Sequence, residues 1–327
     1  MRNLRAVFFF VVCVVAVYGT LRVFGNPLTK PTDWPVLSAI SGASYASELK
    51  TLAARYDKAP VNAHVVKYWG LIPALNGVKL DIKKSLSHQN LQNKSASPLF
   101  FEQIAPAVST FSLVAEPIYR ANPQKRQMAL MINVAWGGEY LPSMLKILMA
   151  HHAKATFFFD GSFAKKNPQA VKMVLQAGME VGNHAYNHPM MTKLSRVKMI
   201  EQITRTNAVI ERAGGVKPAL FAPPAGDVNA LVVRAAAGLG MHTILWTLDT
   251  IDWRKPSVSV ILHRIVDHRE PGALVLMHPT ANTVAALPRM IEQLQSAGYQ
   301  LVTVSSIISP TRPIPKTYGE AVAGARA

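Results

Sequence analysis

The fold is decided by residues 154–188, which read KATFFFDGSFAKKNPQAVKMVLQAGMEVGNHAYNH. Two apolar runs in it, Ala155–Asp160 and Met179–Asn183, predict short strands. Between them, Pro168–Ala177 has the spacing of an amphipathic helix, and Gly178 stands where a helix stop belongs. Strand, helix and strand in this order indicate two parallel strands joined by a crossover helix.

The same alternation extends over residues 126–310. Further strands are expected at Met128–Val134, Ala219–Ala222, His242–Leu248, Ala273–His278 and Gln300–Val304. Further helices are expected at Pro142–His152, Arg196–Ala213, Ala230–Ala237, Val258–His268 and Val284–Ala297, with N-caps at Ser195 and Ser257 and stops at Gly214 and Gly298. The pattern predicts an α/β domain with a parallel sheet, open or closed. A closed barrel would place its active residues at the C-terminal ends of the strands.

Composition excludes several classes of protein. Half of the 327 residues are hydrophobic, which excludes disorder over most of the chain, and a single cysteine excludes a disulfide scaffold. Only one apolar run approaches a membrane span, which argues against a polytopic membrane protein. Lys and Arg number 35 against 18 Asp and Glu, and the net charge of +17 favours an anionic partner. The basic residues are dispersed, so we expect anionic envelope polymers or lipid and no nucleic acid.

The N-terminus is expected to be a membrane anchor. Ala6–Leu21 carries no charge, Arg2 and Arg5 precede it, and Arg22 follows it. As a helix the run would extend about 24 Å, and with Arg22 snorkelling it spans the membrane through residues 6–24. The flanking charges orient the N-terminus inward, which predicts a single-pass protein of the cell membrane whose C-terminal part is extracytoplasmic. A cleaved signal peptide is the alternative, although no small-x-small cleavage site is visible.

Four regions are expected: residues 1–26 as anchor, 27–125 as a small α+β or spacer region, 126–310 as the barrel, and 311–327 as a tail. In the second region, Ala43–Arg55 predicts a helix. Asn62–Leu75 and Val78–Ile82 predict strands joined by a hairpin turn at Asn76-Gly77. Nothing in this region has catalytic spacing.

Polar side chains that are capable of catalysis or metal binding lie at or just past the C-terminal ends of the predicted strands. They are Asn133, Asp160, His184, Asp249, Asp252 and His278. His184 and His188 can meet one metal ion if their segment turns as a helix, or they are a capping or surface pair. His278 is a candidate general acid with Asp252 as its neighbour, or it is a hydrogen-bonded structural group.

Several blocks together resemble a known family. They are Lys154–Gly161, Gly182–His188, Phe221–Gly226 with Asn229, Trp246–Trp253 and Leu276–His278. In this order they resemble the NodB-homology polysaccharide deacetylases, carbohydrate esterase family four. The segment Ile132–Tyr140 further resembles a membrane-anchored, sporulation-linked subgroup from spore-forming bacteria.

The resemblance implies a distorted (β/α) barrel that hydrolyses N-acetyl groups on peptidoglycan or a related cell-wall glycan. It implies a divalent metal ion as cofactor, with zinc expected, and a cell-wall glycan as partner. His184 and His188 correspond to metal ligands. His278 corresponds to the general acid, with Asp252 as its orienting carboxylate. The resemblance also implies substrate contacts at Trp246 and Pro224.

The chain departs from the family where the catalytic base belongs. Asn133 and Val134 stand in place of two adjacent aspartates, a base and a metal ligand. Ala222 replaces the arginine that steadies the base. Asp160 could compensate as a metal ligand or base, or it caps the Gly161-Ser162 turn. Glu139, just past the altered motif, is the other carboxylate, or it is a first-turn helix charge.

Three interpretations therefore remain. The first, which we favour, is a metal-dependent hydrolase of carbon–nitrogen bonds other than peptide bonds, with a rearranged base. The second is a degenerate deacetylase fold that binds cell-wall glycan without turnover. The third is a scaffold protein of the envelope.

Overall fold

The computed structural model describes residues 34–324. The expected anchor at residues 6–24 lies outside the described residues. Within the described part, no helix is both long enough and apolar enough to cross a membrane.

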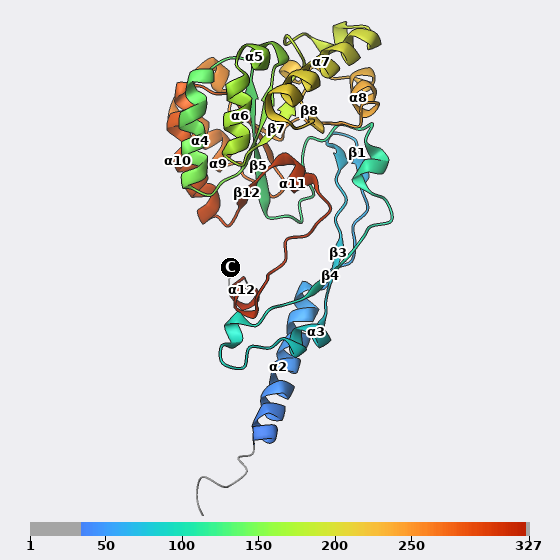
Figure 1. The fold of residues 1–327 in the computed structure, drawn as a ribbon, viewed down its shortest axis with the longest axis vertical. Helices are drawn as coiled ribbons and strands as arrows, with labels where there is room; N and C mark the ends of the chain where they lie inside the picture. The colour runs from blue at the N-terminus through green and yellow to red at the C-terminus, as the bar shows by residue number, and fades with distance from the viewer. Residues whose placement is uncertain (1–33, 325–327) are drawn as a thin grey trace, which may run out of the picture.

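One curled sheet of eight strands forms the centre of the barrel (Figure 1). The strands are β5 (Gln127–Val134), β6 (Ala155–Phe159), β7 (Glu180–Asn183), β8 (Leu220–Phe221), β9 (His242–Thr243), β10 (Leu248–Asp249), β11 (Leu274–Met277) and β12 (Gln300–Val302). Their order is β10-β11-β5-β6-β7-β8-β9, with β12 beside β5, and every pairing is parallel. The prediction of a parallel sheet is confirmed.

The predicted strand His242–Leu248 is wrong, because it divides into β9 and β10. β9 pairs with β8 and β10 pairs with β11, so the chain crosses from one edge of the sheet to the other between them. Ile118 bridges this crossing: its amide donates to Thr243 O (2.9 Å), and its carbonyl accepts from the amide of Leu245 (2.8 Å). The apolar residues of the crossing gave the same pattern as a continuous strand because they are buried as a strand would be.

Helices cover the outer face of the sheet, and Figure 1 shows α4, α6, α9 and α10 on one side of it. Their bounds are α4 (Leu141–Ala150), α5 (Gly161–Lys166), α6 (Pro168–Gln176), α7 (Arg196–Gly214), α8 (Ala230–Ala237), α9 (Val258–Val266), α10 (Ala281–Ser296) and α11 (Val304–Ile308). Ser195 and Ser257 cap α7 and α9 as predicted. The predicted stop at Gly214 is one residue early, because Gly215 takes the left-handed conformation (φ 72°) that ends α7.

Successive side chains of β5 point alternately to the outside and to the inside of the barrel. Its even-numbered residues, through Ile132 and Val134, pack in the cluster shared with the outer helices. Ala129 and Met131 pack in the cluster inside the barrel. Since successive side chains of a strand point to opposite faces, Asn133 belongs to the inner face and Val134 to the outer one.

A smaller region precedes the barrel. Its elements are α2 (Trp34–Tyr56), β1 (His64–Val66), β2 (Gly70–Ile72), β3 (Gly77–Leu80), α3 (Ile82–Ser87) and β4 (Phe101–Ile104), with 3-10 turns η1 (Lys94–Ala96) and η2 (Thr110–Leu113). β1 pairs with β2, and β3 pairs with β4, all antiparallel. The predicted hairpin at Asn76-Gly77 is therefore wrong. Gly77 begins β3, and a Cβ there would lie 2.7 Å from Pro60 Cδ, so a close approach requires this glycine rather than a turn.

The C-terminal residues pack against this smaller region. Helix α12 (Tyr318–Ala323) lies beside α2, at the end of the molecule away from the sheet (Figure 1). The Tyr318 hydroxyl donates to the Glu48 carboxylate, and the Tyr56 hydroxyl donates to the carbonyl of Ala321 (2.8 Å). The C-terminal helix thus returns to the first described helix.

Lys125 gives a pH-dependent prediction for stability. Its buried ammonium donates to the carbonyls of Ser306 (3.2 Å), Ile307 (3.1 Å) and Ser309 (2.5 Å) at the end of α11. Burial, with Arg312 nearby, lowers the pKa of Lys125 from 10.5 to about 8, so the unfolded chain binds more protons between these pH values. The free energy of unfolding should rise across this window by on the order of 2 kcal/mol relative to Lys125→Met. Urea denaturation of the unmodified chain and of Lys125→Met, each at pH 8 and at pH 10.5, tests this. An equal change in the free energy of unfolding of both chains would contradict it.

Candidate functional site

A cavity of about 380 Å³ opens at the C-terminal ends of the strands. It is lined by Asn133, Trp136, His184, His188, Ala225, Trp246, Asp249, Trp253, Leu276 and His278. The fold thus brings together the three histidines expected at the site, the altered position 133 and Trp246. They come from segments far apart in the sequence and meet because the strands that carry them are parallel.

His184, directly after β7, has a fixed orientation. Its Nδ1 lies 2.7 Å from the carbonyl of Ala222. Since a carbonyl only accepts, Nδ1 carries the proton and Nε2 is left with its lone pair. Burial, then the neighbouring His188, lower the pKa of His184 to about 3, so its ring is neutral at physiological pH. A neutral imidazole held through its other nitrogen is the form that binds metal ions.

The segment between the two histidines is not the expected helical turn. Ala185 (φ 60°) and His188 (φ 54°) both have left-handed backbones, which a helix excludes. The turn still brings the rings of His184 and His188 together, with centroids 5.1 Å apart and planes at 71°. The amide of Gly161 fastens it by donating to the carbonyl of Ala185 (2.9 Å).

Asp160 lies outside the cavity lining and caps α5. Its Oδ1 accepts from the amide of Phe163 (2.9 Å) and from the hydroxyl of Ser162 (2.6 Å). A Cβ at Gly161 would lie 3.1 Å from Tyr186 Cα, so the small residue lets the start of α5 reach the histidine turn. Asp160 thus caps α5 through Oδ1, while its Oδ2 is buried without a hydrogen-bond partner among the described residues.

His278 and Asp252 form a hydrogen-bonded pair at the end of β11. The Nδ1 of His278 lies 2.8 Å from Oδ1 of Asp252, which is fully buried. Oδ2 of Asp252 accepts from the His278 amide (2.6 Å) and from the hydroxyl of Thr283 (2.6 Å). These bonds fix the ring and leave its Nε2 as the free nitrogen. This is the arrangement that a histidine needs to exchange a proton with a ligand.

Trp136 belongs to the site, although sequence reasoning gave it no role. Its ring stacks on that of His278, with centroids 5.8 Å apart and planes at 7°. The next residue, Gly137 (φ 73°), passes so close to Pro279 that a Cβ would lie 2.2 Å from the Pro279 carbonyl oxygen. The loop after β5 is thereby packed onto the segment that follows His278. The position of Trp136 just past the altered motif is the signal in the sequence that could have found it.

Asp249 is the carboxylate that lines this cavity. The sequence places it at a strand end and assigns it no role. Its Oδ1 accepts from the amide of Ile251 (2.8 Å), and burial is the main cause that raises the pKa of its carboxyl. An acid shifted in this direction takes up protons more readily than an exposed aspartate does.

The positions of the expected base and third metal ligand hold no carboxylate. Oδ1 of Asn133 is buried and has no hydrogen-bond partner among the described residues. Val134 faces the outer helices, and Ala222 is buried. In the part of the chain that the structure describes, no group of three His, Cys, Asp or Glu residues could hold a metal ion. Two imidazoles alone do not fit a catalytic metal site with three protein ligands.

Of the two expected substrate contacts, one lines the cavity and the other does not. Trp246 lines the cavity, and a Cβ at Gly226 would lie 2.6 Å from its ring, so the close approach fixes the indole. Pro224 is buried in the turn η5 (Pro224–Gly226) and lies outside the cavity lining. Ala225 lines the cavity from a left-handed position (φ 53°).

Comparisons with known proteins agree on one family. The model of the family described as "Polysaccharide deacetylase" matches residues 120–244. The uncharacterized protein YlxY of Bacillus subtilis is 44% identical over 81% of this chain and 83% of its own length. A peptidoglycan-N-acetylglucosamine deacetylase of Bacillus cereus is 31% identical over 58% of this chain and 70% of its own.

Solved structures add a second finding. The crystal structure of BA3943 from Bacillus anthracis, a CE4 family pseudoenzyme, has a TM-score of 0.76 and 41% identity, covering 82% of this chain and 96% of that one. A BA3943 mutant with restored enzymatic activity has a TM-score of 0.75 and 39% identity, covering 82% and 99%. The family's deacetylases are hydrolases of carbon–nitrogen bonds, and chains similar to this one include pseudoenzymes. This chain belongs to the polysaccharide deacetylase family, carbohydrate esterase family four.

Proposed function

We propose that this chain binds an N-acetylated glycan strand of peptidoglycan in the cavity, with the missing carboxylates holding hydrolysis at a low level. One observation carries the proposal. The His278–Asp252 pair and the oriented His184 are intact around a cavity in which Asn133 and Val134 replace the base and the third metal ligand. The names of peptidoglycan deacetylases among the relatives support this choice of glycan.

Asn133 supplies a binding contact in place of a base. Its Oδ1 is buried without a partner among the described residues, and its side chain lines the cavity. A buried acceptor of this kind is satisfied when a ligand brings a donor to it. The N–H of an acetamido group is such a donor, whereas a carboxamide cannot take a proton from water as an aspartate does.

We further propose that a divalent metal ion, zinc in the first place, is held weakly by His184 and His188. Neutral imidazoles are good ligands for zinc. With the third position occupied by Val134, the affinity should fall well below that of a complete site. Glycan binding should then survive removal of the metal.

A second candidate function is metal-dependent hydrolysis with a rearranged base, and Asp249 favours it. Asp249 is a cavity carboxylate whose pKa is raised by burial. As the carboxylate in the cavity lining, Asp249 is the group there that can take a proton from water. This candidate requires acetate release from N-acetylglucosamine oligomers that Asp249→Asn and His184→Ala both abolish.

Titration of the full chain with N-acetylglucosamine tetramer, with and without chelator, tests the proposal. The dissociation constant should be unchanged by chelator and should rise about tenfold in Asn133→Leu, because a hydrogen bond of about 1.4 kcal/mol is lost. Asn93→Leu, at an exposed position in the smaller region, is the matched control and should bind as the unmodified chain does. Loss of binding with chelator, or rapid acetate release, would favour the second candidate.

We also propose that residues 6–24 anchor the chain in the cell membrane with the barrel on the extracytoplasmic side, near anionic envelope polymers. The net charge of +17 and the resemblance to a sporulation-linked subgroup support this location. Protease added to cells stripped of their wall should digest the barrel without lysis. Protection until lysis would contradict it.

A further inference from the structure

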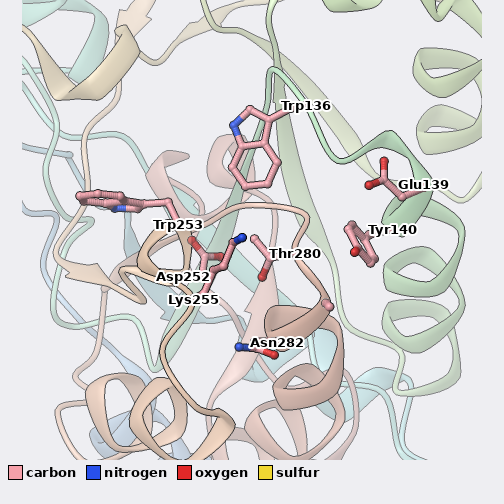
Figure 2. Close-up of a pocket in the computed structure, with 9 residues that line it drawn as sticks. Trp136, Glu139, Tyr140, Asp252, Trp253, Lys255, Thr280 and Asn282 are labelled. Carbon is pink, nitrogen blue, oxygen red and sulfur yellow. The ribbon is translucent and has the colours of Figure 1, made fainter.

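A second cavity of about 480 Å³ adjoins the first. Its lining consists of Trp136, Glu139, Tyr140, Asp252, Trp253, Lys255, Thr280, Ala281 and Asn282, and Figure 2 shows how these side chains surround it. Trp136, Asp252 and the 3-10 turn η6 (Asp252–Arg254) connect it with the histidine site. Trp136 and Trp253 line both cavities, so the two spaces share a wall. A ligand that fills the first cavity and continues as a chain passes these two residues.

The shared wall suits a sugar chain. Trp136 and Trp253 are 45% and 51% exposed, although large aromatic side chains usually find burial in the core. Exposed aromatic faces beside a cavity are typical of a ligand-binding groove, and an indole offers an apolar face with a polar edge. One face of each ring is already covered, that of Trp136 by His278 and that of Trp253 by the guanidinium of Arg254, 4.7 Å from the ring centroid. The remaining exposed surface of the two tryptophans is placed to contact the sugar that follows the one in the first cavity.

Lys255 is the positively charged residue that lines the second cavity. It has a left-handed backbone (φ 56°), which is uncommon for a residue with a side chain. Its amide donates to the carbonyl of Asp252 (2.9 Å), and Asn282 Nδ2 donates to the carbonyl of the next residue, Pro256 (2.8 Å). The surrounding chain thus holds Lys255 in a conformation that costs energy, as is common at ligand sites.

Lys255 is exposed, and no ion pair joins it to a carboxylate among the described residues. Asp252 lines the same cavity, but both of its oxygens are bonded to His278 and one also to Thr283. Glu139 lies on another wall of the cavity (Figure 2), and no ion pair joins it to Lys255 among the described residues. An anionic group is therefore favoured on the Lys255 side and disfavoured on the Glu139 side.

We propose that the second cavity binds the carboxylate-bearing substituent of the sugar next to the acetamido sugar in the first cavity, through Lys255. This inference rests on the proposed glycan function and adds a requirement for an acidic neighbour. In peptidoglycan the carboxylate has two sources. One is the free lactyl group of a muramic acid without its peptide, and the other is a carboxylate of the peptide stem.

Binding of the full chain to three tetrasaccharides tests the proposal by calorimetry. They are an N-acetylglucosamine tetramer, a bare glucosaminyl-muramyl tetrasaccharide, and the same tetrasaccharide with peptide stems. Lys255→Gln should weaken binding of at least one muramyl ligand about fivefold and leave the glucosamine tetramer unchanged. Lys255→Arg should restore the affinity, and Lys146→Gln, an exposed residue on α4, is the matched control.

The outcomes separate this proposal from the one on which it depends. A selective loss with the bare muramyl ligand identifies the lactyl carboxylate, and a loss confined to the peptide-bearing ligand identifies the stem. Equal affinities for all ligands in Lys255→Gln and the unmodified chain would overturn the acidic subsite while the glycan function stands. Absence of binding to all three ligands would overturn both.

Discussion

The double variant Asn133→Asp/Val134→Asp is expected to bind close to one equivalent of zinc and to release acetate from N-acetylglucosamine oligomers. It places a base on the cavity side of β5, at position 133, and it supplies a third ligand at position 134 once the end of β5 turns toward His184 and His188. General base catalysis contributes about 10²–10⁴-fold, so acetate release should exceed that of the unmodified chain at least about a hundredfold. The BA3943 mutant with restored enzymatic activity is a precedent in a similar pseudoenzyme.

Val134 explains why this gain has a cost in stability. Its side chain is fully buried among the outer helices, where an aspartate carboxylate is destabilising by several kilocalories per mole. An ion that binds only the folded chain stabilises it, so zinc should favour the form in which the end of β5 turns toward the cavity. The double variant should therefore melt at a lower temperature than the unmodified chain without zinc and recover when zinc is added.

The two single variants distinguish the role of the base from that of the metal ligand. Val134→Asp should gain zinc without comparable turnover, and Asn133→Asp should gain neither tight zinc binding nor turnover. Metal per chain is measured by elemental analysis after dialysis, and acetate by a coupled assay. A double variant that folds but binds no zinc would contradict the expectation that a carboxylate at position 134 reaches His184 and His188.

In the double variant, His278→Gln should lower acetate release by about 10²–10⁴-fold while zinc binding remains. The pair with Asp252 holds the His278 ring with Nε2 free, and that nitrogen is the proton donor available to a leaving amine. Asp252→Asn should lower the rate as well, because a carboxamide at this position no longer stabilises the imidazolium.

A matched control exists on the surface. His263 on α9 and Asp267, which caps the end of this helix, form a pair of the same type, with Nδ1 and Oδ2 2.6 Å apart, and both side chains are exposed. His263→Gln should leave acetate release unchanged. If His278→Gln removes the zinc instead, His278 is a metal ligand and the assignment as acid is wrong.

Most of the barrel could be predicted from helix caps and apolar runs, because each of these signals depends on only a few neighbouring residues. Ser195 and Ser257 cap helices as their side chains require, and the apolar run of β6 is buried along its whole length. The errors arose where tertiary contacts decide. The segment His242–Leu248 joins two edges of the sheet, and Asn76-Gly77 begins a strand because Gly77 must pass close to Pro60.

The site was predictable where one motif carries one role. His184, His188 and His278 are recognisable as strand-end residues, and they meet in the cavity. The nearness of Trp136 and Lys255 was missed because they stand on two loops that approach one another at the second cavity. The spacing of residues along the sequence does not show which loops approach one another in the fold.

We expect the bridge made by Ile118 to belong to the smallest piece of this chain that folds by itself. The amide of Ala121 donates to the carbonyl of Gly272 (2.8 Å), so these residues tie both sides of the gap between β9 and β10. A truncation at residue 125, where the sequence composition changes, would leave two short edges with unpaired amides, which are templates for aggregation. An autonomous version of the barrel must therefore begin before Ile118, and recombinant fragments that start later should collect in the insoluble fraction.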